Sequence, residues 1–217
     1  VFLGIYGYLR STLPDYDGKI IVPGLYDQVE IIRYSYGMPH IYARRNEDVT
    51  FALGYCMAQD RLFQMDLVRR AARGRLSEIM GEDFVAVDKF FRTITAGKSM
   101  QDIAAEYPIE TRTGLKSYAA GVNHYIQNHR GPLPIEFTLL GYEPDPWQAS
   151  DGAAVHYYMA WDLTSAFYVE ILYAAVIDKV GEELAKDIFP DYPEGYPTID
   201  LGQFALSDFL ETLKIVR

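Results

Sequence analysis

Residues Gly54–Gly81 read GYCMAQDRLFQMDLVRRAARGRLSEIMG and combine an apolar stripe with closely spaced charges. In a helix of about 3.6 residues per turn, side chains three, four and seven positions apart lie on one face. The apolar residues that fit one face are Leu62, Phe63, Met65, Val68 and Ala72. A helix that is both this apolar and this charged must contact other elements on several sides, so this segment decides the fold.

The charged residues of the same segment predict ion pairs. Asp66 precedes Arg70 by one helical turn, so these two side chains can pair along the helix. The Asp60-Arg61 dipeptide predicts an internal ion pair where the helix enters a core, because arginine is seldom buried unpaired. No nucleophile–base pair accompanies these charges, and we therefore interpret them as structural.

Composition and charge restrict the classes of protein to which the chain can belong. Its 217 residues are 49% hydrophobic, 14% aromatic and 23% charged, which is typical of a globular protein. The 30 acidic residues outnumber the 20 basic ones, and the net charge is −10. Nucleic acids and anionic membranes are bound through basic patches, so we expect neither as a partner. The basic residues concentrate only at Arg69, Arg70, Arg73 and Arg75, and we expect these side chains to spread around the helix.

No motif in the sequence predicts a self-contained catalytic site. The four histidines lack the spacing of a zinc site, and the sequence contains neither an HExxH motif nor paired cysteines. It also contains no Gly-x-Ser-x-Gly elbow and no glycine-rich phosphate loop. The single cysteine, Cys56, lies in an apolar context and is interpreted as a small core residue.

Local patterns predict one β-hairpin followed mainly by helices. Residues 29–33 are rich in β-branched side chains, residues 34–39 can turn, and residues 40–43 can return as a second strand. Asn46 is a suitable N-cap for the next helix. The prolines at 132, 134, 144 and 146 predict an extended connection. The predicted helices span residues 47–59, 60–73, 99–106, 110–128, 151–158 and beyond, and 169–180. No linker divides the chain, so we expect a single region over residues 1–217.

Residues 1–28 form an N-terminal extension before the hairpin. The apolar run 1–9 is far too short to span a bilayer, which takes about 20 residues. Two interpretations stay open. The run is the remnant of an export signal or membrane anchor, or it is a packed strand or helical turn.

Four motifs carry a resemblance to a known family. They are Tyr36–Ala43 (YGMPHIYA), the segment Gly54–Gly81, Asp88 with Arg92, and Leu140–Trp147 (LGYEPDPW). In this order they resemble the penicillin acylase family of N-terminal nucleophile hydrolases, over most of the chain. The resemblance implies an α+β fold, in which a mostly helical α subunit of an αββα sandwich contributes the hairpin near residues 29–43.

The resemblance also implies how the reaction is divided between chains. Such acylases resemble precursors that cut themselves into two chains, which then form an obligate heterodimer. The nucleophile is the N-terminal serine of the second chain, the β subunit, which can use its own α-amine as base. No catalytic residue is therefore assigned to residues 1–217. The implied reaction is hydrolysis of N-acyl amides through an acyl-serine intermediate, with penicillin-type β-lactams, N-acyl homoserine lactones and related compounds as open alternatives.

A helix after the Trp147 landmark is implied to line the acyl pocket, and here it reads YMAWDLTS from Tyr158. The sequence lacks the arginine and phenylalanine that penicillin G acylases show there, so the substrate preference stays open. For each candidate the alternative is packing in an ordinary helical core. The candidate substrate-binding residues are Met159, Ala160, Leu163 and Thr164.

Glu170 occupies the position of a calcium-binding carboxylate in the family. Calcium takes about six to eight oxygen ligands, so the implied structural site is shared with the β subunit. The alternative is a solvated glutamate near the start of a helix.

The resemblance to exported enzymes implies a periplasmic, extracellular or cell-surface location, including a membrane-anchored precursor. Two rival interpretations of the function remain. The 18 tyrosines suit a chain that is partly buried against a partner, since tyrosine offers apolar area with a polar tip. They could equally line a sugar or peptide groove, as in a non-catalytic helical binding module. The chain can equally be an inactive member of the family.

Overall fold

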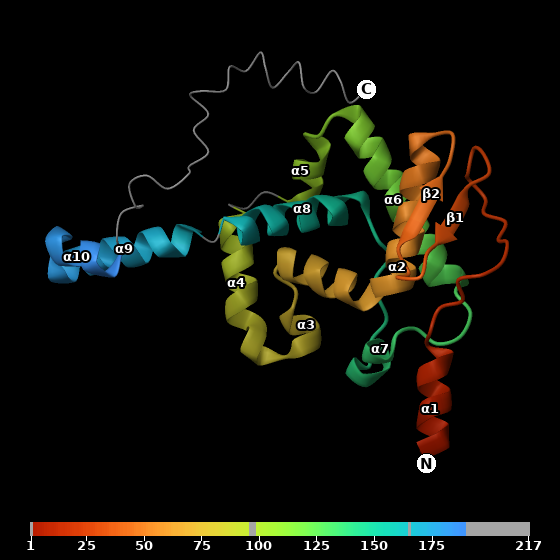
Figure 1. The fold of residues 1–217 in the computed structure, drawn as a ribbon, viewed down its shortest axis with the longest axis horizontal. Coiled ribbons are helices and arrows are strands. Elements are labelled where there is room, and N and C mark those ends of the chain that lie inside the picture. Colours follow the sequence, from red (N-terminus) through yellow and green to blue (C-terminus); the bar gives the residue numbers. More distant parts are fainter. Residues whose placement is uncertain (1, 96–98, 165, 190–217) are drawn as a thin grey trace. The chain divides into compact units, whose positions relative to one another are not determined.

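The computed structural model describes residues 2–95, 99–164 and 166–189 (Figure 1). These residues are mostly helical and contain one two-stranded antiparallel sheet. The chain divides into two compact units, residues 1–163 and 164–217. The prediction of a mostly helical chain with one hairpin is confirmed. We predicted that residues 1–217 form a single region of one subunit. Two compact units can belong to one subunit, so this stays a prediction.

Helices make up most of the described residues in each unit. The first unit contains α1 (Phe2–Ser11), α2 (Asn46–Ala72), α3 (Ser77–Met80), the 3₁₀ helix η1 (Glu82–Phe84), α4 (Val85–Ile94), α5 (Met100–Ala105), α6 (Ile109–Asn128), α7 (Ile135–Leu140) and α8 (Ala149–Leu163). The second contains α9 (Ala166–Val180) and α10 (Glu182–Ile188), separated by Gly181 with a positive φ of 82°.

The predicted helices are present, and several short ones were not predicted. The helix predicted at 99–106 is α5, where Ser99 and Asp102 form a reciprocal capping box. The prediction that Asn46 caps the next helix was wrong, because Asn46 is the first residue of α2 and no side chain caps that end. The prediction of a wholly extended segment between residues 132 and 146 was also wrong. It contains α7, which starts after Pro134 and ends at the left-handed Gly141.

The predicted hairpin is confirmed and is fastened to α2. Strands β1 (Glu30–Arg33) and β2 (Pro39–Tyr42) pair with Ile31 opposite Ile41. Arg33 Nη1 donates to the carbonyl of Gly37 in the turn at 2.7 Å. The same guanidinium donates to Gln59 Oε1 at 2.9 Å and to Asp60 Oδ2 at 3.0 Å. One side chain therefore sets both the turn and the position of the hairpin on α2.

Helix α2 is kinked at Arg61, whose φ of −153° and ψ of 38° are not helical. The sequence predicted two helices that meet at residues 59 and 60, and the kink lies beside that boundary. The predicted internal ion pair of Asp60 with Arg61 was wrong, because Arg61 is exposed and Asp60 pairs with Arg33. Adjacent residues of a helix, such as Asp60 and Arg61, point in different directions and cannot pair with each other. Arg33, which is distant in sequence, pairs with Asp60 instead. Figure 1 shows the bend between the two parts of α2.

The first part of α2 packs closely on α6 through glycine. A Cβ on Gly121 would lie 2.8 Å from the carbonyl carbon of Phe51 and closer still to its oxygen. A Cβ on Gly54 would overlap the carbonyl of Tyr118 in the same way. The main buried cluster forms beside this contact from Ala58, Leu62, Met65, Ala119, Val122, Tyr125, Phe137 and Trp147.

Residues 149–180 contain a segment that is long and apolar enough, by length and composition alone, to cross a membrane, with a mean hydropathy of 1.3. A single segment of this kind is weak evidence for a span, because the core helices of soluble proteins meet the same criteria. The window that meets these criteria is not buried among the described residues, although Ala153 and Ala154 at the start of α8 lie in the core.

Replacing Gly121 with alanine should lower the free energy of unfolding by about 2 kcal/mol, because the added methyl group forces α2 and α6 apart. Gly114→Ala in the same helix is the matched control, since its Cβ would meet only Thr50 Cγ2 at 3.8 Å. We expect Gly114→Ala to leave stability unchanged or raise it by up to about 1 kcal/mol. Urea unfolding followed by circular dichroism measures both, and equal effects would contradict the packing described here.

Candidate functional site

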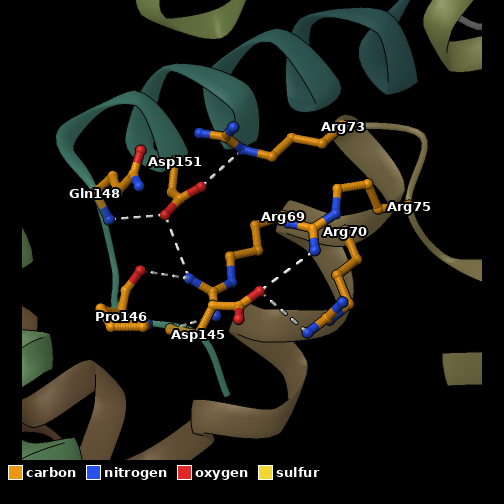
Figure 2. Close-up of a pocket in the computed structure, with 8 residues that line it drawn as sticks. All are labelled: Arg69, Arg70, Arg73, Arg75, Asp145, Pro146, Gln148 and Asp151. Atoms are coloured by element: carbon orange, nitrogen blue, oxygen red, sulfur yellow. Dashed lines mark hydrogen bonds and ion pairs between the residues drawn. The ribbon is translucent and has the colours of Figure 1, made fainter. Parts of the chain in front are cut away.

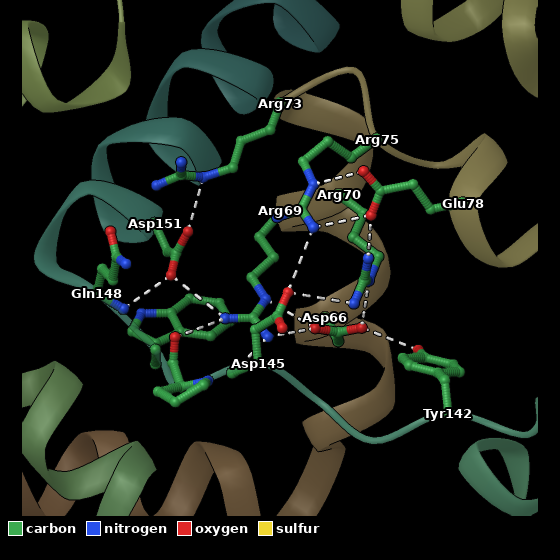
Figure 3. Close-up of polar contacts among 12 residues, drawn as sticks. Asp66, Arg69, Arg70, Arg73, Arg75, Glu78, Tyr142, Asp145, Gln148 and Asp151 are labelled. Atoms are coloured by element: carbon green, nitrogen blue, oxygen red, sulfur yellow. Dashed lines mark hydrogen bonds and ion pairs between the residues drawn. The ribbon is translucent and has the colours of Figure 1, made fainter.

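Asp66 lies on the second part of α2 at the centre of a buried network of arginines and carboxylates (Figure 3). Its carboxylate accepts hydrogen bonds from Arg69 Nε at 2.7 Å and from Arg70 Nε at 2.9 Å. The hydroxyl of Tyr142 donates a third at 2.8 Å. Burial and this hydrogen bond to Asp66 raise the pKa of Tyr142, so the hydroxyl remains a donor. The predicted pairing of Asp66 with Arg70 is confirmed.

Arg69 fastens the loop before α8 to α2. Its Nη2 donates to the carbonyl of Asp145 at 2.6 Å, and its Nη1 lies 3.4 Å from the carbonyl of Pro146. The guanidinium lies over the ring of Trp147, 4.9 Å from its centroid. Arg69 thus contacts two backbone carbonyls and the aromatic ring of the LGYEPDPW motif. These contacts account for the order of Asp145, Pro146 and Trp147 in this loop.

Asp151 connects the same network to the first turn of α8. Its carboxylate accepts from the backbone N–H of Gln148 at 2.7 Å and so caps the start of the helix. Arg69 Nη1 lies 3.3 Å from Asp151 Oδ2, and Arg73 Nε lies 2.7 Å from Asp151 Oδ1. Arg73 also donates to the hydroxyl of Ser150 at 2.7 Å. The start of α8 is therefore fixed against the end of α2.

Glu78 and Asp145 complete the network at its outer edge. Arg75 donates to both oxygens of Glu78, each at 2.8 Å, and Arg70 Nη1 donates to the same carboxylate at 2.9 Å. The hydrogen bond from Arg75 is the main reason that the pKa of Glu78 is lowered. Asp145 Oδ2 lies 3.4 Å from Arg75 and 3.5 Å from Arg70.

The arginines converge on one pocket of about 340 Å³ (Figure 2). The prediction that they spread around the helix was wrong. Helix α2 ends at Ala72, and the left-handed Gly74, with φ of 60°, turns the chain so that Arg75 reaches the same pocket. Each arginine faces a carboxylate, so the pocket carries no surplus positive charge. We conclude that the network is structural, as the sequence analysis predicted. Its carboxylates are Asp66, Glu78, Asp145 and Asp151.

The Asp88 and Arg92 motif holds the turn after α2. The Asp88 carboxylate accepts from the backbone N–H groups of Leu76 at 2.7 Å and Ser77 at 2.9 Å. Arg92 Nε donates to the carbonyl of Gly74 at 2.8 Å. Burial raises the pKa of Asp88, but the hydrogen bonds from Ser77 and Leu76 outweigh it and leave that pKa lowered.

The two predicted acyl-pocket residues with large side chains lie on an exposed side of α8. Met159 is 54% exposed and Leu163, one turn later, is 80% exposed. Ala160 is exposed on the same helix. The alternative of ordinary core packing therefore does not hold for Met159 and Leu163 within this chain. Their role in substrate binding stays a prediction.

The opposite side of α8 packs on α4 through an aromatic cluster that the sequence analysis missed. The ring centroids of Trp161 and Phe91 are 4.9 Å apart, and those of Trp161 and Phe90 are 5.6 Å apart. Tyr158 adds a contact with Phe91 at 5.4 Å. The signal in the sequence was the spacing of Tyr158 and Trp161, three residues apart, but their partners on α4 follow only from the fold.

Thr164 and Glu170 belong to the second unit, where both are exposed. Glu170 lies on α9. In the parts of the chain that the structure describes, no three His, Cys, Asp or Glu side chains are grouped as metal ligands. Among the described residues, Glu170 is therefore not part of a group of carboxylates that could hold calcium by itself.

Two of the histidines make contacts that explain their positions. His124 packs against Phe51 and Tyr55 at 6.0 and 6.1 Å, and burial lowers its pKa. His156 Nδ1 lies 2.9 Å from the hydroxyl of Tyr107, which joins α8 to the segment before α6.

Replacing Asp66 with asparagine should lower the free energy of unfolding by about 3–5 kcal/mol, because buried arginines lose their shared anion. Asp27→Asn is the matched control. Asp27 and Arg44 form a surface pair at 3.9 Å, and its loss should cost at most about 1 kcal/mol. Both variants can be compared by urea unfolding. A cost for Asp66→Asn as small as that of the control would mean that the network does not hold the fold.

Comparison with known proteins agrees with these motifs. The family model described as Penicillin amidase matches residues 28–204. The Penicillin acylase 2 proenzyme of Pseudomonas sp. (strain SE83) is 40% identical over 147 residues, which are 68% of this chain and 19% of that protein. The acyl-homoserine lactone acylase QuiP of Pseudomonas aeruginosa is 33% identical over 184 residues, 85% of this chain and 22% of that protein. The chain thus spans about a fifth of the length of these relatives.

A comparison with solved structures also places the fold of this chain close to that of a penicillin acylase. The thermostable penicillin G acylase from Alcaligenes faecalis matches with a TM-score of 0.59 and 26% sequence identity. The match covers 79% of this chain and 95% of that one. By its sequence and by its fold, the chain belongs to the penicillin amidase family.

Proposed function

We propose that this chain forms the α subunit of a heterodimeric amidohydrolase that removes the acyl group from N-acyl compounds. Membership of the penicillin amidase family supports an acylase, and the word proenzyme in the name of one relative supports processing of a precursor. The likeness in fold to a solved penicillin G acylase chain supports the same assignment. The finer fold proposed is the helical part of an αββα sandwich.

The observation that carries the proposal is the two-sided arrangement of α8. Phe91 and Trp161 hold one side of the helix in place, while Met159 and Leu163 on the other present apolar surface. An apolar side chain on a rigid helix suits an acyl group, since burial of each methylene stabilises binding by about 0.8 kcal/mol. We propose that these residues, with Ala160 and Thr164, line the acyl pocket in the assembled enzyme.

The chemistry then belongs to the second chain. Its N-terminal serine attacks the amide carbonyl carbon, with its own α-amine as base, and the amine product leaves as the acyl-serine forms. Water hydrolyses this ester and releases the carboxylic acid. The substrates proposed are penicillin-type β-lactams, N-acyl homoserine lactones or related amides, and the residues of α8 decide among them through the shape of the acyl pocket.

The apolar side chains on the surface also support a partner chain over the rival binding module. Ile21 is 97% exposed and Tyr36 is 96% exposed. Burial of side chains this exposed by a second chain would remove their apolar area from water, which favours association. Production of the full-length protein, followed by intact-mass analysis and N-terminal sequencing, tests the proposal. A co-purifying chain that begins with serine, together with hydrolysis of N-acyl substrates, supports it. A processed but inactive protein supports the inactive family member, and a lone monodisperse chain supports the binding module.

We also propose a structural calcium ion shared between the chains, with Glu170 as the ligand from this one. Calcium takes about six to eight oxygens, so the second chain supplies most of them. The bound ion would contribute to the stability of the assembly rather than to the reaction. A periplasmic, extracellular or cell-surface location, including an anchored precursor, completes the proposal.

Replacing Met159 with glutamate should lower kcat/KM for N-acyl substrates by about 10-fold or more, because a charge then meets the acyl chain. Asp162→Asn on the same helix is the matched control and should leave kcat/KM unchanged, since Asp162 is exposed and polar already. A series of substrates with increasing acyl length measures both variants. Equal kinetics for Met159→Glu and the control would remove Met159 from the pocket.

Replacing Glu170 with alanine should lower the calcium content of the assembled protein, because one carboxylate ligand is lost. Glu183→Ala, at an exposed position in α10, is the control and should keep the calcium content. Elemental analysis after dialysis against calcium-free buffer gives the content. Equal calcium in both variants would reject Glu170 as a ligand.

A further inference from the structure

A second pocket, of about 360 Å³, lies where α5, α6 and the start of α8 meet. The side chains that give it its chemistry are Gln101, Arg112, Leu115, Lys116, Gln148 and Ser150. No carboxylate is among the residues that line it. This contrasts with the arginine pocket, where each cation faces an anion, and with the net charge of −10 of the whole chain.

Arg112 carries a donor that lacks an acceptor. Its Nε is buried and has no hydrogen-bond partner among the residues that the structure describes. Neither Arg112 nor Lys116 forms an ion pair among residues 2–95, 99–164 and 166–189. A buried donor without a partner is costly, and a partly buried guanidinium is stabilised by an anion. The pocket therefore presents two cations that no carboxylate of its lining neutralises.

The fold holds these two cations in a fixed relation. They lie one turn apart on α6, with Leu115 between them in sequence. Leu115 packs against Gly152 of α8 so closely that a Cβ on Gly152 would lie 2.5 Å from Leu115 Cδ2. This contact sets α6 against the first turns of α8 and places Arg112 and Lys116 in the same pocket as the start of that helix.

Hydrogen bonds also fix the polar side chains of Gln101, Gln148 and Ser150, which line the pocket together with the two cations. Gln148 Oε1 lies 3.4 Å from Gln101 Nε2 and accepts from the hydroxyl of Ser150 at 3.3 Å. The Ser150 hydroxyl in turn accepts from Arg73 at 2.7 Å. With its oxygen engaged, the side-chain amide of Gln148 has N–H groups to offer.

We propose that this pocket binds a small oxyanion through its carboxylate or phosphate group. Arg112 supplies a fork of donors that matches two oxygens, and Lys116 supplies a second positive charge. A volume of about 360 Å³ fits a small molecule rather than a protein segment. The ligand is a free anion, and the site is independent of the acyl pocket and of the proposed hydrolysis.

The test is a binding titration on the full-length protein at constant ionic strength. Inorganic phosphate and malonate are titrated by calorimetry with chloride as the background anion, in the absence of any N-acyl substrate. We expect saturable binding of at least one of them. Lys116→Gln and Arg112→Gln should each weaken it by about 10-fold or more, since hydrogen bonds between charged groups contribute about 1.5–3 kcal/mol.

Two features keep the experiment decisive. Lys116 is exposed, so Lys116→Gln should fold even if Arg112→Gln does not. Arg44→Gln, which removes another exposed arginine, is the charge-matched control and should bind the anion as the unchanged protein does. Absence of saturable binding, or equal binding by all variants, overturns the proposal. A crystal structure with a carboxylate of a neighbouring protein segment in the pocket also overturns it, in favour of an interface.

Discussion

The ion pairs of Asp66 with Arg69 and Arg70 are the constraint on which the rest of the first unit depends. Two guanidinium groups that leave water need several acceptors each, and one carboxylate cannot provide them all. Backbone carbonyls of the loop before α8 supply the remainder for Arg69. The position of that loop, and hence of α8, therefore follows from the need to satisfy charges that α2 carries into the interior.

Much of the fold could be predicted because its signals are local. The hairpin near residues 29–43 and the pairing of Asp66 with Arg70 follow from spacings of two and four residues. The partner of Asp60 could not be predicted in this way, because Arg33 is 27 residues distant and reaches it only through the fold. Likewise, α7 was missed because prolines favour extended chain on both sides of it, although proline is tolerated just before a helix.

The candidate site shows the same division between local and tertiary information. Met159 and Leu163 were named from a resemblance, and the structure adds that both are exposed on α8. The aromatic contacts that hold this helix came from α4, so no pattern within residues 149–163 could reveal them. The convergence of Arg75 with the arginines of α2 also needed the turn at Gly74, which a helical wheel does not represent.

The two sides of α8 have a consequence for how the protein can be altered. On one side, Trp161 is packed among aromatic rings, and most changes there would disturb the fold before they reached a ligand. On the other side, Met159 and Leu163 are exposed and contribute little to the stability of this chain. Diversity in a mutant library can therefore be concentrated at the second side, where variants remain foldable. Under the proposed function, the same separation would let natural sequences drift in specificity without passing through unstable intermediates.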